Sequence, residues 1–250
     1  MRNLKSVLSY DGSGFMGWQV QAGVRTVQET VEAALQQLLK HPVRVTASGR
    51  TDAGVHALGQ VMHFFTSSSI PPDGLLRGLN ALLPRDVAVR SVEDAPPDFH
   101  ARFMAREKTY AYVLHTAAVR NPFLDRYALQ VGRPLDCGAM REALGTLVGE
   151  HDFASFQGTG SAVKTTVRTI RAAGLVEKGD RVYVWMQGSG FLRHMVRNIV
   201  GTLLMVGERR LEPADMSRIL DLRDRTQAGP TAPPQGLYLV GVAYGGSVTP

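Results

Sequence analysis

Asp52 is the first carboxylate in the sequence whose surroundings are suited to chemistry. It lies between Gly49 and Gly54, next to Arg50, in the segment GRTDAGVH. Flanking glycines permit unusual backbone angles and the close approach of a ligand. The alternative is an aspartate that caps a turn through nearby backbone amides. The local sequence therefore leaves both a catalytic and a structural Asp52 open.

A second group of polar residues lies in an otherwise apolar stretch, Phe191 to Gly207, which has helical periodicity. It contains Arg193, His194 and Arg197, and the two arginines are four residues apart, on one predicted face. Such arginines often extend to solvent along an apolar surface. The functional alternative is an arginine held in a cleft against a carboxylate or a phosphate.

Two further features are compatible with RNA binding. Tyr110 and Tyr112 alternate with Lys108 on a predicted strand, where an aromatic ring can stack on a base or fill a half-buried face. The sequence GSGF occurs at Gly12 to Phe15 and again at Gly188 to Phe191, where an anion could bind ahead of the following helix. Neither copy has the spacing of a Walker loop.

Metal and cofactor chemistry is not indicated by the sequence. The seven histidines are scattered, there is no HExxH, and Cys137 is the only cysteine. The zinc deaminase pattern and a GxGxxG after a strand are also missing. We therefore expect no metal and no dinucleotide site.

Length and charge narrow the class of protein. The 250 residues, 44% of them hydrophobic, suffice for one large domain or two ordinary ones. We find neither a secretory signal nor an apolar run long enough to span a membrane, and a single cysteine precludes an intrachain disulfide, so a cytoplasmic protein is expected. The net charge is +6, and the whole basic excess lies beyond residue 100. A polyanionic partner is favoured.

The elements that would position these residues alternate in a regular order. The first part predicts β-α-β-β-α-β, with strands and helices over Leu4–Tyr10, Thr26–Leu39, Val43–Ala47, Gln60–Thr66, Pro71–Leu83 and Asp86–Val92. The second part predicts the same order with one extra helix, over Lys108–His115, Asp136–Gly149, Thr166–Val176, Arg181–Met186, Phe191–Gly207, Glu212–Leu222 and Gly236–Ala243. The segment Asp224 to Gln235 is expected to be a mobile loop.

The fold class is thus α+β, with two ferredoxin-like lobes. We expect an N-terminal lobe, residues 1–97, that carries the Asp52 loop, and a basic C-terminal lobe, residues 98–250, that carries the arginine-bearing helix. Their antiparallel sheets are predicted to join around a central cleft.

Several segments together resemble the TruA family of tRNA pseudouridine synthases, in order along nearly the whole chain. They are YDGSGFMGWQ (residues 10–19), RTVQE (25–29), SGRTDAGVHALGQVMHF (48–64), NALLP (80–84), DFHARF (98–103), HDFASF (151–156), FLRHMVRNIVGTLLMVG (191–207) and GLYLVGVAY (236–244). The resemblance implies the pseudouridine synthase fold and isomerisation of uridine to pseudouridine at positions 38, 39 and 40 of the tRNA anticodon stem-loop. It also implies a homodimer that needs no cofactor.

Roles for individual residues follow from the resemblance. Asp52 matches the catalytic aspartate, called the nucleophile by family convention; attack at C1′, addition to the ring and removal of a ribose proton all stay open. Arg50 matches an arginine that helps flip the base, Tyr110 the tyrosine that stacks on it, and Arg197 the charge partner of the aspartate. The substrate-binding apolar residues would be Phe191, Leu237 and Leu239.

Two other functions remain possible from the sequence. A non-catalytic RNA-binding module would need exposed aromatics in an RNP1-like string, which we do not find. A glycosylase would share the flipped base and the carboxylate but would release free uracil.

Overall fold

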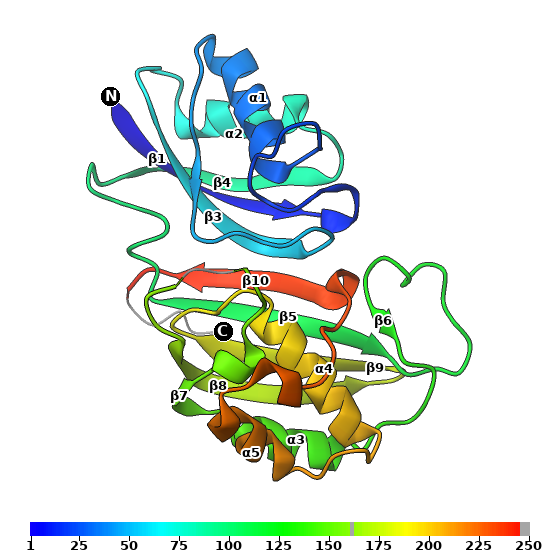
Figure 1. Ribbon diagram of the computed structural model, residues 1–250. Helices are drawn as coiled ribbons and strands as arrows, with labels where there is room; N and C mark the ends of the chain where they lie inside the picture. The colour runs from blue at the N-terminus through cyan, green and yellow to red at the C-terminus, as the bar shows by residue number, and fades with distance from the viewer. Residues whose placement is uncertain (161–162, 246–250) are drawn as a thin grey trace. The chain divides into compact units, whose positions relative to one another are not determined.

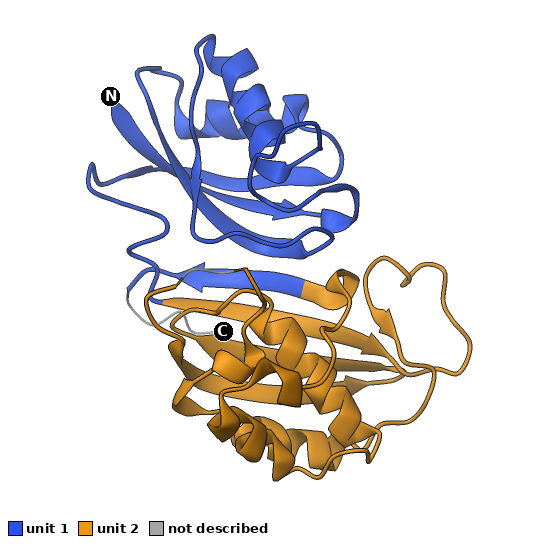
Figure 2. Ribbon diagram, in the orientation of Figure 1, with its two compact units in different colours: residues 1–106, 238–250 blue, residues 107–237 orange. Residues whose placement is uncertain are grey.

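The computed structural model describes residues 1–160 and 163–245, with five α-helices and ten strands in that part of the chain. The chain forms two compact units (Figure 2): residues 1–106 together with the final segment from Tyr238, and residues 107–237. The first unit extends past the boundary at residue 97 that the sequence predicts. Phe99 and Ala101 are buried against Val61, and the Asn3 amide donates hydrogen bonds to the carbonyls of Pro96 and Phe99.

The first unit contains the predicted β-α-β-β-α-β order (Figure 1). Its elements are β1 (Arg2–Tyr10), α1 (Val27–Leu39), β2 (Thr46–Ala47), β3 (His56–Thr66), α2 (Pro72–Leu82) and β4 (Val87–Ala95). β1 pairs antiparallel with both β3 and β4, and β2 pairs antiparallel with β3. This is the strand arrangement of a ferredoxin-like unit.

Local signals explain the two helices of this unit. The Thr26 hydroxyl accepts a hydrogen bond from the Glu29 amide at the start of α1, as the capping spacing predicts. Helix α1 buries one apolar face and ends at Lys40, which is left-handed with φ 62°. Helix α2 begins at Pro72 and ends before the extended Leu83, which precedes Pro84. The caps define where the two helices begin and end, and packing of their apolar faces stabilises them.

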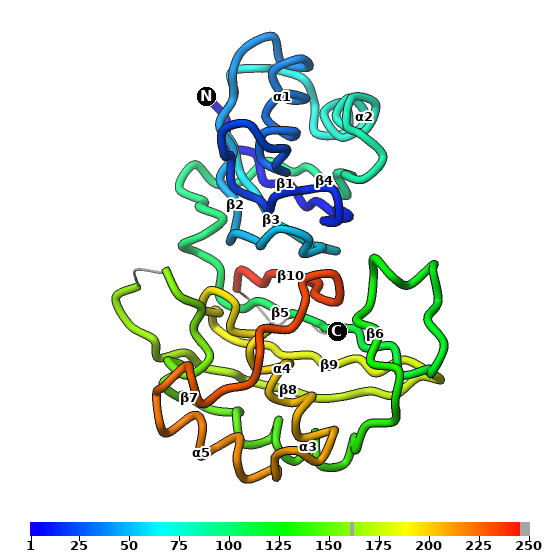
Figure 3. Tube along the Cα trace, turned by 45° about the vertical axis from the view of Figure 1, so that its right-hand side comes forward, coloured from blue at the N-terminus to red at the C-terminus, as the bar shows by residue number. Residues whose placement is uncertain are grey.

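The strands of the second unit follow the order β5-β9-β8-β7. Its elements are β5 (Glu107–His115), β6 (Leu129–Gln130), α3 (Cys137–Gly145), β7 (Gly149–Asp152), β8 (Val167–Lys178), β9 (Arg181–Gly188), α4 (Met195–Gly207) and α5 (Asp215–Leu222). Helices α3, α4 and α5 lie together against this sheet (Figure 3). The last strand, β10 (Leu237–Ala243), begins at the end of this unit, and its Tyr238 and Leu239 pair in parallel with β3 of the first unit.

One helix begins later than the sequence predicts. α4 starts at Met195 rather than at Phe191, because His194 adopts a left-handed conformation with φ 59° at the N-cap. Arg193 therefore lies before the helix and does not share a helical face with Arg197. Its guanidinium donates hydrogen bonds to the carbonyls of Thr159 and Gly160.

Three other boundaries differ from the prediction. β2 contains only Thr46 and Ala47, because the amide of Val45 donates to the Glu32 carboxylate instead of to a strand. β3 begins at His56, so the loop that contains Asp52 ends at Val55. Helix α3 ends at Gly145, and the following chain forms the edge strand β7, which the sequence did not indicate.

The segment predicted to be a mobile loop is in fact bonded to α4. The Arg225 side chain donates to Asn198 and Thr231, and the Ala232 amide donates to the Arg197 carbonyl. Two 3-10 turns, Arg225–Gln227 and Pro234–Gly236, shape its ends. The polar residues of this segment form hydrogen bonds within the protein. Composition alone does not distinguish such residues from those of a solvent-exposed loop.

Candidate active site

The catalytic candidate Asp52 lies in a tight turn between β2 and β3. The amide of Val55 donates a hydrogen bond of 3.1 Å to the Asp52 carbonyl, and Gly54 has φ +76°. A positive φ favours glycine at this place. The turn is thus closed by main-chain atoms. Asp52 is partly exposed, and Arg50 on the same loop is exposed.

The glycine-rich loop of residues 11–18 packs directly against this turn. A Cβ on Gly12 would be 2.0 Å from the Val55 carbonyl oxygen, and one on Gly17 would be 2.8 Å from the carbonyl oxygen of Thr51. Two main-chain hydrogen bonds, Trp18 to Thr51 at 3.0 Å and Gly54 to Phe15 at 3.2 Å, join the two loops. The first GSGF copy therefore supports the Asp52 turn by close backbone contact.

Buried polar side chains hold the other side of the turn. The Tyr10 hydroxyl and the Thr51 hydroxyl share a hydrogen bond of 2.9 Å. Gln60, fully buried, donates to the Gly49 carbonyl at 2.9 Å and accepts from the Ser48 hydroxyl at 2.7 Å. Burial raises the pKa of Tyr10 to about 12, so its hydroxyl keeps its proton at neutral pH.

His56, the last residue of the GRTDAGVH motif, has a structural role that the sequence did not reveal. Its side chain is 2% exposed, and its Nδ1 accepts a hydrogen bond from the Gly12 amide at 3.1 Å. The ring stacks on Tyr238, with centroids 4.7 Å apart. His56 thereby joins the turn, the glycine-rich loop and strand β10. Its position directly after the aspartate loop was the only available signal.

Leu239 lies next to this stack in β10. It is fully buried and pairs with Ala57 of β3. Leu237, the other predicted apolar pocket residue, is 5% exposed and ends the second unit. Both leucines are buried, and their role as walls of a uracil pocket stays a prediction.

In the second unit, Tyr110 and Phe191 are neighbours. Tyr110 lies on β5 and is partly exposed, and the edge of one ring meets the face of the other at 78°, with centroids 5.1 Å apart. Phe191 follows β9, whose Met186 pairs with Tyr110. In contrast, Tyr112 is fully buried and donates a 2.6 Å hydrogen bond to the Pro233 carbonyl. The two tyrosines predicted together therefore differ in exposure, and the stacking of Tyr110 on a base stays a prediction.

Arg197 is partly buried on α4. Its Nε donates a 2.7 Å hydrogen bond to the Ala232 carbonyl. Burial raises the pKa of Tyr112, whereas the positive charge of Arg197 acts in the opposite direction. This position differs from a side chain extended to solvent, the alternative that the sequence left open. The pairing of Arg197 with Asp52 stays a prediction.

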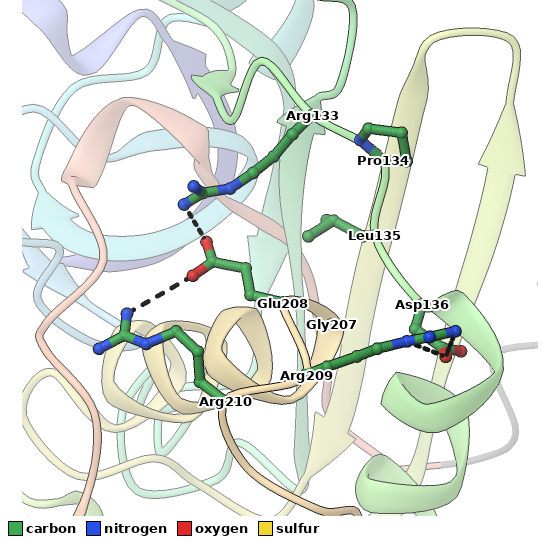
Figure 4. A pocket seen from close by; sticks show the side chains of 8 residues that line it. All are labelled: Arg133, Pro134, Leu135, Asp136, Gly207, Glu208, Arg209 and Arg210. Atoms are coloured by element: carbon green, nitrogen blue, oxygen red, sulfur yellow. Dashed lines mark hydrogen bonds and ion pairs between the residues drawn. The ribbon is translucent and has the colours of Figure 1, made fainter.

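A cavity of about 410 Å³ lies at the C-terminal end of α4 (Figure 4). Arg133 and Arg210 contact Glu208, and Arg209 contacts Asp136. The three arginines share two carboxylates, so most of the positive charge in the wall is paired. Gly207 in its wall is ten residues beyond Arg197, roughly 15 Å along the helix, so this cavity is separate from the predicted site residues.

The described ranges 1–160 and 163–245 contain no group of three metal-ligating side chains, and no helix within them is both long and apolar enough to cross a membrane.

Comparison with known proteins identifies the class. The family model described as tRNA pseudouridine synthase matches residues 7–104 and 143–245. The fold class predicted from the sequence, the α+β pseudouridine synthase fold, is confirmed.

Named relatives agree with the family model over almost the whole chain. "tRNA pseudouridine synthase A" of Geobacter sulfurreducens is 48% identical over 98% of this chain and 100% of its own length. Proteins of the same name from Exiguobacterium (45%; 98% and 98%) and Geobacillus (48%; 97% and 98%) are similar. The chain therefore belongs to the tRNA pseudouridine synthase family and is an isomerase.

A solved structure, a Cbf5-Nop10-Gar1 complex, also matches, with 15% identity and a TM-score of 0.37, over 81% of this chain and 45% of the other. A similarity of this size bears no weight here.

Proposed function

We propose that the protein isomerises uridine to pseudouridine at positions 38, 39 and 40 of the tRNA anticodon stem-loop, with Asp52 as nucleophile. Family membership and the names of the relatives support the reaction and the substrate. The observation that carries the role of Asp52 is the turn itself, held from below by the backbone of Gly12 and Gly17. Such close backbone contacts restrict the conformation of the turn that carries the reacting group, as precise catalytic geometry requires.

The reaction needs a carboxylate and no redox partner. The N1–C1′ bond of uridine breaks, the uracil turns, C5 bonds to C1′, and the C5 proton is lost while N1 gains one. Atoms and electrons balance within the nucleoside and solvent. Asp52 on this turn supplies the carboxylate, and Arg197 acts as its charge partner.

The remaining residues are assigned to substrate binding. Arg50, exposed beside Asp52, helps to flip the base out of the stacked stem. Tyr110 stacks on the flipped uracil, and its contact with Phe191 fixes the ring plane. Leu237 and Leu239 form apolar walls of the uracil pocket.

The assembly and its setting are also proposals. The protein acts in the cytoplasm as a homodimer that binds tRNA across both subunits. The net charge of +6 supports binding to the phosphate backbone, with an affinity that falls as salt rises. Sedimentation of the protein with and without tRNA tests the dimer.

The central experiment replaces Asp52 by asparagine, which preserves its size. Pseudouridine formation on an unmodified tRNA should be lost, while tRNA binding is kept. Asp73→Asn on α2 serves as the matched control and should retain activity. Wild-type turnover by Asp52→Asn would refute the nucleophile. Release of free uracil by the wild-type protein would instead indicate a glycosylase, and binding without any turnover a non-catalytic module.

A further inference from the structure

The chain between α5 and β10 crosses α4 as a strap, defined here as residues 225–236. At the crossing, a Cβ on Gly201 of α4 would be 1.7 Å from the carbonyl oxygen of Pro230. The amide of Gly229 donates a 2.9 Å hydrogen bond to the Thr202 hydroxyl, which itself donates to the Asn198 carbonyl. The strap therefore lies directly on the helix backbone, and a side chain at residue 201 would displace it.

Three polar side chains connect the strap to the helix beside this crossing. Asn198, fully buried, accepts hydrogen bonds at its Oδ1 from the Thr231 hydroxyl at 2.6 Å and from Arg225 at 3.1 Å. Arg225 also donates to the Thr231 hydroxyl at 3.2 Å. The Asn198 amide group donates to the Phe156 carbonyl at 2.8 Å, which fixes its orientation.

Two residues of this cluster are neighbours in sequence of Arg197 and of its hydrogen-bond partner Ala232. Asn198 follows Arg197 on α4, and Thr231 precedes Ala232 on the strap. The Arg197 Nε donates to the Ala232 carbonyl at 2.7 Å, and the Ala232 amide donates to the Arg197 carbonyl at 3.1 Å. A guanidinium is planar, so a bond at Nε restricts the direction in which its two terminal amino groups point.

We propose that Asn198, Arg225 and Thr231 are positioning residues for Arg197 in the isomerisation. The cluster holds the Ala232 carbonyl, the carbonyl orients the guanidinium, and the guanidinium acts on the catalytic carboxylate. This inference rests on the proposed role of Arg197 as charge partner. It goes beyond that role because it assigns a function in the reaction to three residues that need not touch the substrate.

The isosteric pair Thr231→Val and Thr231→Ser tests the proposal. Valine removes the hydroxyl and keeps the volume, whereas serine keeps the hydroxyl. Thr231→Val should lower kcat on the order of tenfold and leave KM for tRNA unchanged, because misorientation of a reacting group affects the chemical step. Thr231→Ser should restore most of kcat. Thr226→Val is the matched control: Thr226 lies on the same strap, is exposed, and donates its hydroxyl hydrogen to Asp224.

A double-mutant cycle separates positioning from general stability. Arg197→Lys removes the planar donor but keeps the charge, and it is combined with Thr231→Val. If the hydroxyl acts through Arg197, the second substitution adds little to the loss in kcat caused by the first. Independent losses that multiply would overturn the proposal, as would wild-type kcat for Thr231→Val with an intact melting transition.

The result also distinguishes this inference from the proposed function. If Arg197→Ala keeps wild-type activity, the charge-partner role itself is wrong. If Arg197→Ala is inactive while Thr231→Val and Arg225→Gln are as active as Thr226→Val, only the positioning role is wrong.

Discussion

The contact between Gly12 and Val55 gives the sharpest test of how the catalytic turn is supported. The φ angle of Gly12 is not in the left-handed region, so Gly12→Ala adds a methyl group without imposing strain on the alanine backbone. That methyl would lie 2.0 Å from the Val55 carbonyl oxygen and 2.4 Å from its carbon. Carbon atoms essentially never come closer than 3.0 Å to such atoms, so the two loops must separate by about 1 Å.

The size of the effect follows from this displacement. The turn of Asp52 ends at Val55, which is 2% exposed and cannot move without disturbing the core. Overpacking of this kind costs about 1–3 kcal/mol of stability. A reacting group that moves by about 1 Å can lose on the order of 10²-fold in rate. We expect Gly12→Ala to fold, to melt at a lower temperature and to lose on the order of 10²-fold in kcat/KM.

Release of tritium from tRNA labelled at uridine C5 measures the reaction, because C5 exchanges its hydrogen for the bond to C1′. Gly14→Ala is the matched control in the same 3-10 turn. Its methyl would meet only the ends of two flexible side chains, Arg25 at 3.1 Å and Asp86 at 3.7 Å. If Gly12→Ala and Gly14→Ala were equally active at a temperature where both are folded, close support from Gly12 would not position Asp52.

Further predictions concern single side chains. Burial raises the pKa of Tyr10 from 10 in the unfolded chain to about 12 in the folded protein, so the protonated hydroxyl contributes its full stability below pH 10 and loses it between pH 10 and 12. We expect the free energy of unfolding to fall by about 3 kcal/mol over this range, and by less in Tyr10→Phe. Denaturant titration at each pH measures this change. Tyr110→Leu should raise KM and lower kcat/KM about tenfold in single-turnover assays, whereas Tyr110→Phe should keep most activity; equal losses would contradict stacking. Arg193→Ala should change kcat less than twofold, unlike Arg197→Ala, because Arg193 is exposed and bonds only to nearby carbonyls in the contacts described.

The parts of the fold that depend on neighbouring residues could be predicted from the sequence. The capping pair Thr26 and Glu29 set the start of α1, and Pro72 the start of α2. The strand predicted over Leu4–Tyr10 lies within β1, Arg2–Tyr10. Family resemblance, and not periodicity, singled out Asp52.

The parts that were missed depend on partners distant in the sequence. The start of α4 is set by His194, whose left-handed backbone is uncommon for residues other than glycine and is not marked by the helical periodicity. The strap looked like a loop because its Gly, Pro and Thr residues are common in loops. Its order comes from Asn198 and Gly201, about thirty residues earlier in the chain. A single sequence does not record such pairs.

The glycine-rich loop of residues 11–18 and the turn of Asp52 contact each other through main-chain atoms. Gly12 and Gly17 lie against the carbonyl oxygens of Val55 and Thr51. Gly17 and Gly54 have positive φ angles, and two main-chain hydrogen bonds join their loops. Glycine adopts such backbone angles without strain. The Tyr10–Thr51 hydrogen bond and the His56–Tyr238 stack add further contacts around the turn. The segments YDGSGFMGW and GRTDAGVH therefore pack together, and a substitution of Gly12 or Gly17 should change the reaction at Asp52 without contacting substrate.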